Sequence, residues 1–206
     1  MRARAAPSAR ARPPPPTPGT PADVPAAPED ALMSPNTSLD PVTDTPTPVP
    51  SAQERAPLTP STLRSIIREL AEQPDRWIHH VRLSTEERWY RRLVAEDDHE
   101  VWLISWLPGQ STGFHDHGGS RGAFAVALGE LEELSLGGPE QGLLIRRLQA
   151  GTARAFGPEY VHDVRNTASG PAVTLHAYSP PLDSMAHYDL RAEGLVRTSE
   201  EGPEQW

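Results

Sequence analysis

GQSTGFHDHGGSRGAFAVALG, residues 109–129, is the stretch around which the rest of the chain is organised. At its centre, His115 and His117 are separated by one residue. On an extended strand such side chains point to the same face, with Cα atoms about 6.5 Å apart. Two imidazoles at that spacing can bind one metal ion. An isolated pair of this kind is more often two surface histidines beside a glycine-rich turn, so the surrounding sequence has to decide.

Short runs with the character of β-strands lie on both sides of this stretch. Residues 130–136 alternate charged and apolar side chains, and Gly137, Gly138 and Pro139 end the run. Many short strands with evenly spaced glycine and proline predict a sandwich or a small barrel. The other predicted strands cover 100–107, 122–129, 142–150 and 152–156.

One helix is predicted at residues 61–73, ahead of the strands. Thr59 or Ser61 can cap its start, and Pro60 and Pro74 bracket it. Its apolar residues follow the i, i+3, i+4, i+7 spacing of a single helix face: Leu63, Ile66, Ile67 and Leu70. We expect this helix to pack on the β-structure and assign it no chemistry.

The spacing of glycines and histidines resembles the first motif of the cupin family. That motif has a glycine, five residues, His-x-His, then a glutamate and a closing glycine. The chain has Gly109, His115, His117 and Gly129 in register, but Gly122 stands at the glutamate position. The resemblance therefore implies a cupin-like site that keeps its histidines and lacks its carboxylate.

A second cupin motif, with a histidine four residues before an asparagine, is matched by Gly151, His162 and Asn166. Gly157 and Glu159 stand where the family usually has proline and glycine. Three histidines without the glutamate are typical of the thiol dioxygenases, and in particular of the cysteine dioxygenase family, which the chain resembles from about Tyr90 to Pro181.

Two further motifs carry this resemblance. Tyr90 and Arg92 match the Tyr-x-Arg pair whose arginine holds the substrate carboxylate in that family, and a frame one residue earlier would select Arg91. The run Thr174-Leu-His176-Ala-Tyr178-Ser-Pro-Pro differs from the family's run only by threonine for serine. Without the family match, two solvated arginines and an ordinary half-polar strand would be serious alternatives.

The resemblance implies an all-β fold, a cupin-type small β-barrel (jelly-roll) with a short N-terminal helical segment and a disordered Pro-rich N-terminal tail. It implies an Fe(II) cofactor and oxidation of cysteine by O2 to cysteine sulfinic acid, with both oxygen atoms added to sulfur. A cysteine at position 122, which some members link to the tyrosine, is absent. The implied metal ligands are His115, His117 and His162, the substrate-binding residues Arg92 and Tyr90, and the catalytic residues Tyr178, His176 and Thr174.

Two other functions stay open on the sequence. One is a dioxygenase for another small thiol such as 3-mercaptopropionate, although family members of that type usually lack the carboxylate-binding arginine. The other is a non-enzymatic metal-binding cupin, which would not need the pair formed by His176 and Tyr178.

Composition divides the chain into three parts. Residues 1–60 hold 16 of the 24 prolines and no aromatic residue, so they cannot bury enough apolar surface to offset their chain entropy. We predict a disordered Pro-rich tail at 1–56, a cupin thiol dioxygenase domain at 57–195 and a C-terminal tail at 196–206. Met33 is an alternative start that would remove the four arginines near the beginning of the chain.

Charge and hydropathy limit the partners. The net charge is −9, of which residues 1–60 carry −1. An acidic body repels phosphate backbones, which argues against nucleic-acid binding. There is no secretory signal pattern and no apolar run of about 18 residues, so we expect a cytoplasmic protein that does not enter membranes. We expect a monomer whose partners are a small-molecule thiol, cysteine, and O2.

Overall fold

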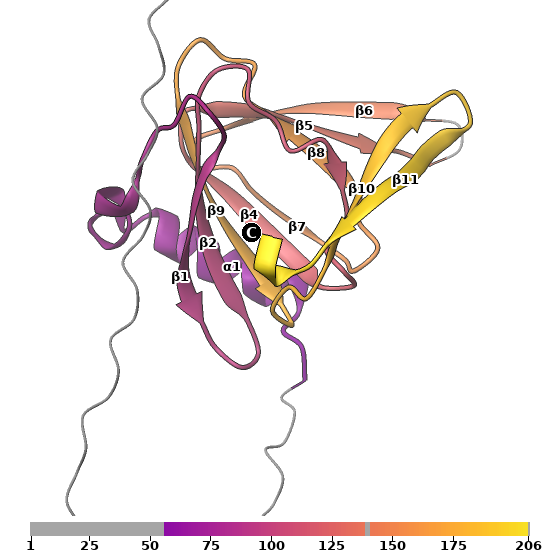
Figure 1. The fold of residues 1–206 in the computed structure, drawn as a ribbon. Coiled ribbons are helices and arrows are strands. Elements are labelled where there is room, and N and C mark those ends of the chain that lie inside the picture. The colour runs from indigo at the N-terminus through magenta and orange to yellow at the C-terminus, as the bar shows by residue number, and fades with distance from the viewer. Residues whose placement is uncertain (1–55, 139–140, 206) are drawn as a thin grey trace, which may run out of the picture. The chain divides into compact units, whose positions relative to one another are not determined.

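Two antiparallel β-sheets face each other and form the body of the protein (Figure 1). The computed structural model describes residues 56–138 and 141–205, so the predicted Pro-rich tail lies almost wholly outside the described residues. The two-sheet, all-β fold predicted from the sequence is confirmed. The first sheet has the strand order β1-β2-β9-β4-β7 and the second the order β11-β10-β3-β8-β5-β6.

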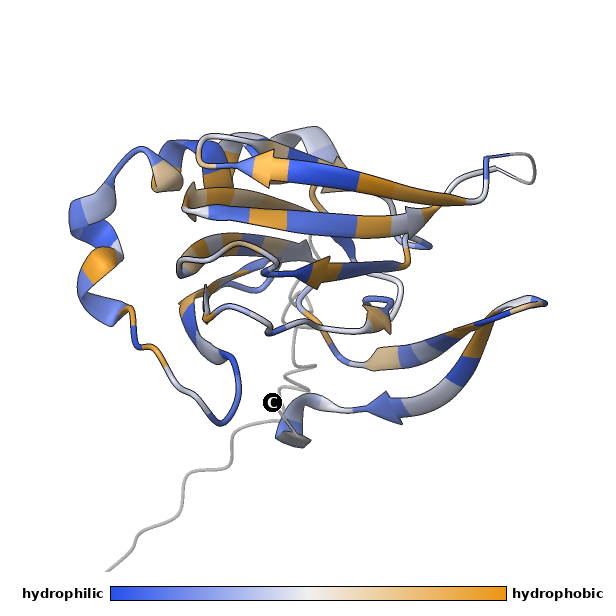
Figure 2. Ribbon diagram, turned by 90° about the horizontal axis from the view of Figure 1, so that it is seen from above, coloured by the Kyte–Doolittle hydropathy of each residue, from blue (hydrophilic) through white to orange (hydrophobic). Residues whose placement is uncertain are grey.

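Five of the strands, β2, β4, β5, β6 and β7, agree to within one residue with the runs predicted from the sequence. Figure 2 shows hydrophilic and hydrophobic residues alternating along several of the strands. Their bounds are β1 (Trp89–Ala95), β2 (Glu100–Trp106), β3 (Phe114–His115), β4 (Arg121–Leu128), β5 (Glu130–Leu136), β6 (Leu143–Gln149), β7 (Ala153–Phe156), β8 (His162–Arg165), β9 (Ala172–Ser179), β10 (Met185–Arg191) and β11 (Gly194–Glu201).

The predicted helix is α1 (Pro60–Ala71), which packs against β4, β7 and β9 (Figure 1). Thr59 caps its start, since the Thr59 hydroxyl accepts a hydrogen bond from the backbone N–H of Thr62 at 3.2 Å. Pro60 occupies the first turn, where its missing N–H costs nothing. Short 3-10 turns follow at Pro74–Arg76 and Ile78–His80, and another, at Pro203–Gln205, comes after the last strand.

Strand β9 is buried along its whole length because both of its faces are covered. Val173, Leu175 and Ala177 belong to the apolar cluster that includes the buried face of α1. The intervening side chains, among them Thr174, His176 and Tyr178, point to the space between the sheets. The helix thus stabilises the strand from outside and leaves its inner face free for polar groups.

Register within the second sheet brings distant histidines together. His115 pairs with His162 across β3 and β8, and with His187 across β3 and β10. Because paired residues in antiparallel strands have Cα atoms about 4.5–5.5 Å apart, this pairing makes neighbours of residues that are far apart in sequence.

The segment predicted as a C-terminal tail contains most of a strand. Strand β11 pairs with β10 from Met185 opposite Glu201 to Arg191 opposite Gly194, so most of β11 lies in the segment predicted as a C-terminal tail, 196–206. None of its side chains is buried, and an edge strand held by backbone hydrogen bonds needs no apolar alternation. The sequence therefore carried no strong strand signal there. None of the helices in the described part of the chain is long and apolar enough to cross a membrane.

Candidate metal centre and active site

The three histidines predicted as metal ligands form one buried group. His115 ends β3, His162 begins β8, and His117 lies in the turn that follows β3. Their rings are close together, with centroid separations of 4.8 Å for His115 and His162, 5.0 Å for His115 and His117, and 5.1 Å for His117 and His162. One potential ligand atom from each lies within 4.8 Å of the others, so the group could hold a metal ion.

Some ring nitrogens of this group have hydrogen-bond partners in the protein, and others have none among the described residues and are free to bind a metal ion. The Nδ1 of His115 lies 3.0 Å from the carbonyl oxygen of Gly113, and the Nδ1 of His162 lies 3.1 Å from a carboxylate oxygen of Glu133. Both acceptors require a proton on Nδ1 and leave Nε2 with its lone pair. Nε2 of His162 is buried without a hydrogen-bond partner among the described residues, and no described side chain hydrogen-bonds to the buried ring nitrogens of His117. Since such burial is costly, these nitrogens fit a metal ion.

Electrostatics keep these imidazoles in the form that binds metals. Burial lowers the pKa of His115 well below its usual value, and the neighbouring His162 lowers it further. Burial likewise lowers the pKa of His117, with His115 and His162 adding to the effect. A neutral imidazole is the metal-binding form, so His115 and His117 need no deprotonation step near neutral pH.

No carboxylate completes the group within the described ranges. Gly122 pairs with Phe156 across β4 and β7, and a Cβ added at Gly122 would collide with the far edge of the Phe156 ring. That ring lies 4.6 Å from the ring of His117. The space that a side chain at position 122 would enter is therefore filled by an aromatic ring.

A second polar row lies on the inner face of β9. The Tyr178 hydroxyl is 3.2 Å from Nδ1 of His176, and Nε2 of His176 is 2.8 Å from the Thr174 hydroxyl. The structure thus brings together the three residues predicted to be catalytic. Trp106, which the sequence analysis did not select, extends the row by donating its indole N–H to the Thr174 hydroxyl at 3.0 Å.

Both ionisable members of this row are held neutral. Burial lowers the pKa of His176 to about 3, with the charges of His162 and Arg88 adding to the effect. Burial raises the pKa of Tyr178 above its usual value, and the Glu100 carboxylate adds to the increase. A neutral tyrosine beside a neutral histidine can exchange hydrogen bonds without adding a charge to the site.

One member of the metal group and two members of the polar row line a cavity of about 320 Å³. His115 contributes from the second sheet, and His176 and Tyr178 contribute from the first. The histidine group thus borders, through His115, a space large enough for a small molecule.

Residues 54–191 match the model of the family described as cysteine dioxygenase type I. The chain belongs to that family. Curated relatives include the type 1 cysteine dioxygenases of Danio rerio and Rattus norvegicus, each 25% identical over 147 and 140 residues, covering 63% of this chain and 69% of the relative.

Solved structures with a similar fold include a Klebsiella pneumoniae protein with a double-stranded β-helix domain, 21% identical, with a TM-score of 0.45 and coverage of 59% of this chain and 93% of that one. A cupin from Desulfovibrio desulfuricans is 17% identical, with a TM-score of 0.42 and coverage of 50% and 91%. Membership of the cysteine dioxygenase family, together with the three-histidine group, supports a thiol dioxygenase that uses a metal.

This member of the cysteine dioxygenase family does not place Arg92 in the cavity. A guanidinium nitrogen of Arg92 lies 3.4 Å from the buried Glu100 carboxylate, and its side chain is 53% exposed. The guanidinium also lies 5.5 Å from the ring centroid of Trp102. Tyr90, the other residue predicted to bind substrate, does line the cavity. Arg91 is exposed.

The arginine that lines the cavity is Arg88, which precedes β1. Its guanidinium carbon lies 5.4 Å from the ring centroid of Trp106, and it has no ion pair with any described carboxylate. Burial lowers the pKa of Arg88, but an arginine stays charged. A signal was present in the sequence, because positions 88, 90 and 92 share one face of an extended chain. The Tyr-x-Arg pattern drew attention only to the C-terminal arginine.

Proposed function

We propose that the protein is an Fe(II)-dependent thiol dioxygenase that oxidises L-cysteine with O2 to cysteine sulfinic acid. One observation carries the proposal: a buried three-histidine group without a carboxylate opens on a cavity that also contains an arginine without a carboxylate partner among the described residues. Imidazole ligands suit Fe(II), and three of them leave positions for other ligands. The arginine suits a substrate with a carboxylate.

In this proposal His115, His117 and His162 hold the iron through their unprotonated nitrogens. Iron, when bound, would supply the activation of O2 and favour the thiolate form of the substrate. The overall change adds both oxygen atoms of O2 to one thiol sulfur, which becomes a sulfinic acid, so it consumes no further reductant.

Arg88 replaces Arg92 as the proposed partner of the substrate carboxylate. Arg88 lines the cavity with Tyr90 beside it, whereas Arg92 already pairs with Glu100. The ring of Trp106 holds the Arg88 guanidinium on its face, so part of the side-chain entropy is lost before substrate arrives. A charged hydrogen bond of this kind contributes about 1.5–3 kcal/mol.

The role proposed for Tyr178 is to offer its hydroxyl to the reacting end of the substrate. Its oxygen is 3.2 Å from His176, which is itself held by Thr174. Because Trp106 can only donate, the Thr174 oxygen accepts from the indole and is held in one place. The row therefore positions a neutral hydroxyl group at the wall of the cavity.

The test is turnover by the purified full-length protein loaded with Fe(II) under O2. We expect cysteine to give cysteine sulfinic acid with one O2 consumed for each sulfinate formed. Cysteamine, which lacks the carboxylate, should be a poor substrate. If 3-mercaptopropionate, which lacks the amine, is oxidised much faster than cysteine, the substrate assignment fails. If iron binds but no thiol is oxidised, the enzymatic proposal itself fails.

A further inference from the structure

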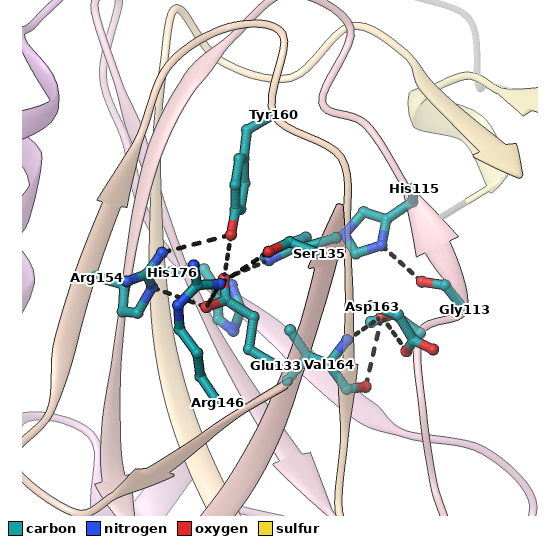
Figure 3. A network of polar contacts seen from close by, with 12 residues as sticks. Gly113, His115, Glu133, Ser135, Arg146, Arg154, Tyr160, Asp163, Val164 and His176 are labelled. Atoms are coloured by element: carbon teal, nitrogen blue, oxygen red, sulfur yellow. Dashed lines mark hydrogen bonds and ion pairs between the residues drawn. The ribbon is translucent and has the colours of Figure 1, made fainter. Parts of the chain in front are cut away.

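One fully buried carboxylate, on the second sheet, contacts a histidine of the metal group. Glu133 is on β5 and has no exposed surface. It pairs with Val164 of β8, and so lies beside the strand that begins with His162. Figure 3 shows its carboxylate at the centre of a polar network formed with Tyr160, Arg154 and Arg146. Neither the cupin motifs nor the thiol dioxygenase motifs drew attention to this residue.

Each oxygen of this carboxylate has a separate set of contacts. One oxygen accepts from the Tyr160 hydroxyl at 3.0 Å and lies 3.1 Å from Nδ1 of His162. The other lies 2.8 Å from Nε of Arg154 and 3.9 Å from a guanidinium nitrogen of Arg146. A buried carboxylate is costly unless it is paired and hydrogen-bonded, and this one is both.

We propose that Glu133 is the positioning residue for His162, and that it sets the affinity of the three-histidine group for its metal. This inference rests on the proposed metal site. A carboxylate can only accept, so it keeps the proton of His162 on Nδ1 and directs the lone pair of Nε2 towards the group. The negative charge also makes the imidazole a more basic ligand.

The three proposed ligands differ in the group that holds each imidazole ring in place. Nδ1 of His115 meets a neutral backbone carbonyl, that of Gly113. Nδ1 of His162 meets a charged carboxylate that is fixed in turn by Arg154 and Tyr160. No described side chain donates to or accepts from His117. The carboxylate therefore gives the group its one charged support, and the arginines hold that support in place.

The alternative role for Glu133 is structural, since it also neutralises two arginines. The two roles make different predictions. A structural role predicts a lower melting temperature with metal binding unchanged at temperatures where the protein is folded. A positioning role predicts weaker metal binding and altered ligand geometry in protein that remains folded.

The experiment titrates Co(II) and, without oxygen, Fe(II) into the metal-free full-length protein, and records affinity and the Co(II) visible absorption spectrum. Glu133→Gln keeps the shape and one acceptor but removes the charge. We expect it to weaken binding of both metals by about 10- to 100-fold and to change the Co(II) spectrum. Glu132→Gln is the matched control, since Glu132 lies on the opposite face of β5 and pairs with Arg147 at 3.3 Å. It should bind metal within about twofold of the wild type.

Glu133→Asp keeps the test decisive if the glutamine variant does not fold. Asp retains the charge that Arg154 needs, but it withdraws the oxygen from His162 by about one carbon–carbon bond, roughly 1.5 Å. We expect a loss of metal affinity in folded protein. Wild-type affinity and an unchanged spectrum in the folded variants would overturn the positioning role while leaving the metal site intact. A wild-type protein that binds neither metal would overturn the metal site, and the positioning role with it.

Discussion

The two walls of the cavity are built differently. The second sheet carries His115 and His162, which are fully enclosed and tied to fixed acceptors. The first sheet carries the side chains proposed to face the substrate, and its β1 end is half-exposed, with Arg88 and Tyr90 lining the cavity from the edge. Short side chains on paired strands have little freedom, whereas an arginine at the start of an edge strand has several rotatable bonds. Strand register therefore determines the arrangement of the histidines on the second sheet, whereas the first sheet depends on which long side chain extends into the cavity.

Loss of a metal ligand tests the first wall and should have the largest effect. His162→Ala removes one of the three buried histidines that could hold the metal ion. We expect metal affinity to fall by more than about a hundredfold, beyond the range for a ligand's outer partner, and turnover to be lost with it. Metal analysis of the purified protein measures this, with His79→Ala as the control, because His79 lies away from the group. Full iron occupancy in the His162 variant would show that the ligand set is wrong.

Arginine substitutions test the second wall. Arg88→Ala should lower kcat/KM for cysteine by about 10- to 150-fold, as expected for a charged hydrogen bond of about 1.5–3 kcal/mol. Arg92→Ala should change it by less than about threefold, since that side chain is half-exposed and paired with Glu100. Steady-state kinetics with cysteine and cysteamine distinguish the two, because cysteamine should lose little in either variant.

Arg91→Ala is the control for this pair, since Arg91 lies on the other face of β1. If Arg92→Ala proves the damaging change, the Tyr-x-Arg frame holds and Arg88 is not the carboxylate partner. If none of the three arginines matters for cysteine, the substrate does not use its carboxylate and another thiol becomes the better candidate.

The polar row on β9 belongs to the first sheet, and its side chains are as fully buried as the histidines of the second sheet. Thr174→Val keeps the shape and removes the hydroxyl that holds both His176 and the Trp106 indole. We expect a loss of about 1–3 kcal/mol in the free energy of unfolding for buried groups left unpaired, and a lower kcat with iron content unchanged. Denaturant unfolding and turnover measure the two effects, and Trp106→Phe should give a smaller loss of the same kind. Unchanged kcat in Thr174→Val would remove the row from the chemistry.

The smallest expected effect concerns the contact between Gly122 on β4 and Phe156 on β7, which pair within the first sheet. Gly122→Cys would push its side chain into the Phe156 ring, and we expect a destabilisation of about 1–3 kcal/mol from overpacking. The double variant with Phe156→Leu should recover part of that loss, because the two positions share one space. Thermal unfolding of the three variants tests this. Equal stability of Gly122→Cys and the wild type would mean that the Phe156 ring moves aside without a cost in stability.

Local patterns in the sequence determined the elements whose side chains need only spacing and periodicity. The helix follows from Leu63, Ile67 and Leu70 on one face, and the row on β9 follows from the period-two repeat of a strand. The histidine group could be predicted because matched motifs imply the ligands even without the register that joins them. The monomeric state and the cytoplasmic location stay predictions.

Tertiary structure decided what depends on contacts between distant segments. Arg88, Tyr90 and Arg92 share a face by sequence alone, but only the position of the cavity along β1 separates the two arginines. Glu133 and Glu132 look alike in the sequence, and only the pairing of β5 with β8 places one of them against His162. An edge strand such as β11 forms through backbone hydrogen bonds to a partner, and such bonds leave no side-chain pattern. Local periodicity records which face a residue occupies, whereas only the packed fold determines what that face meets.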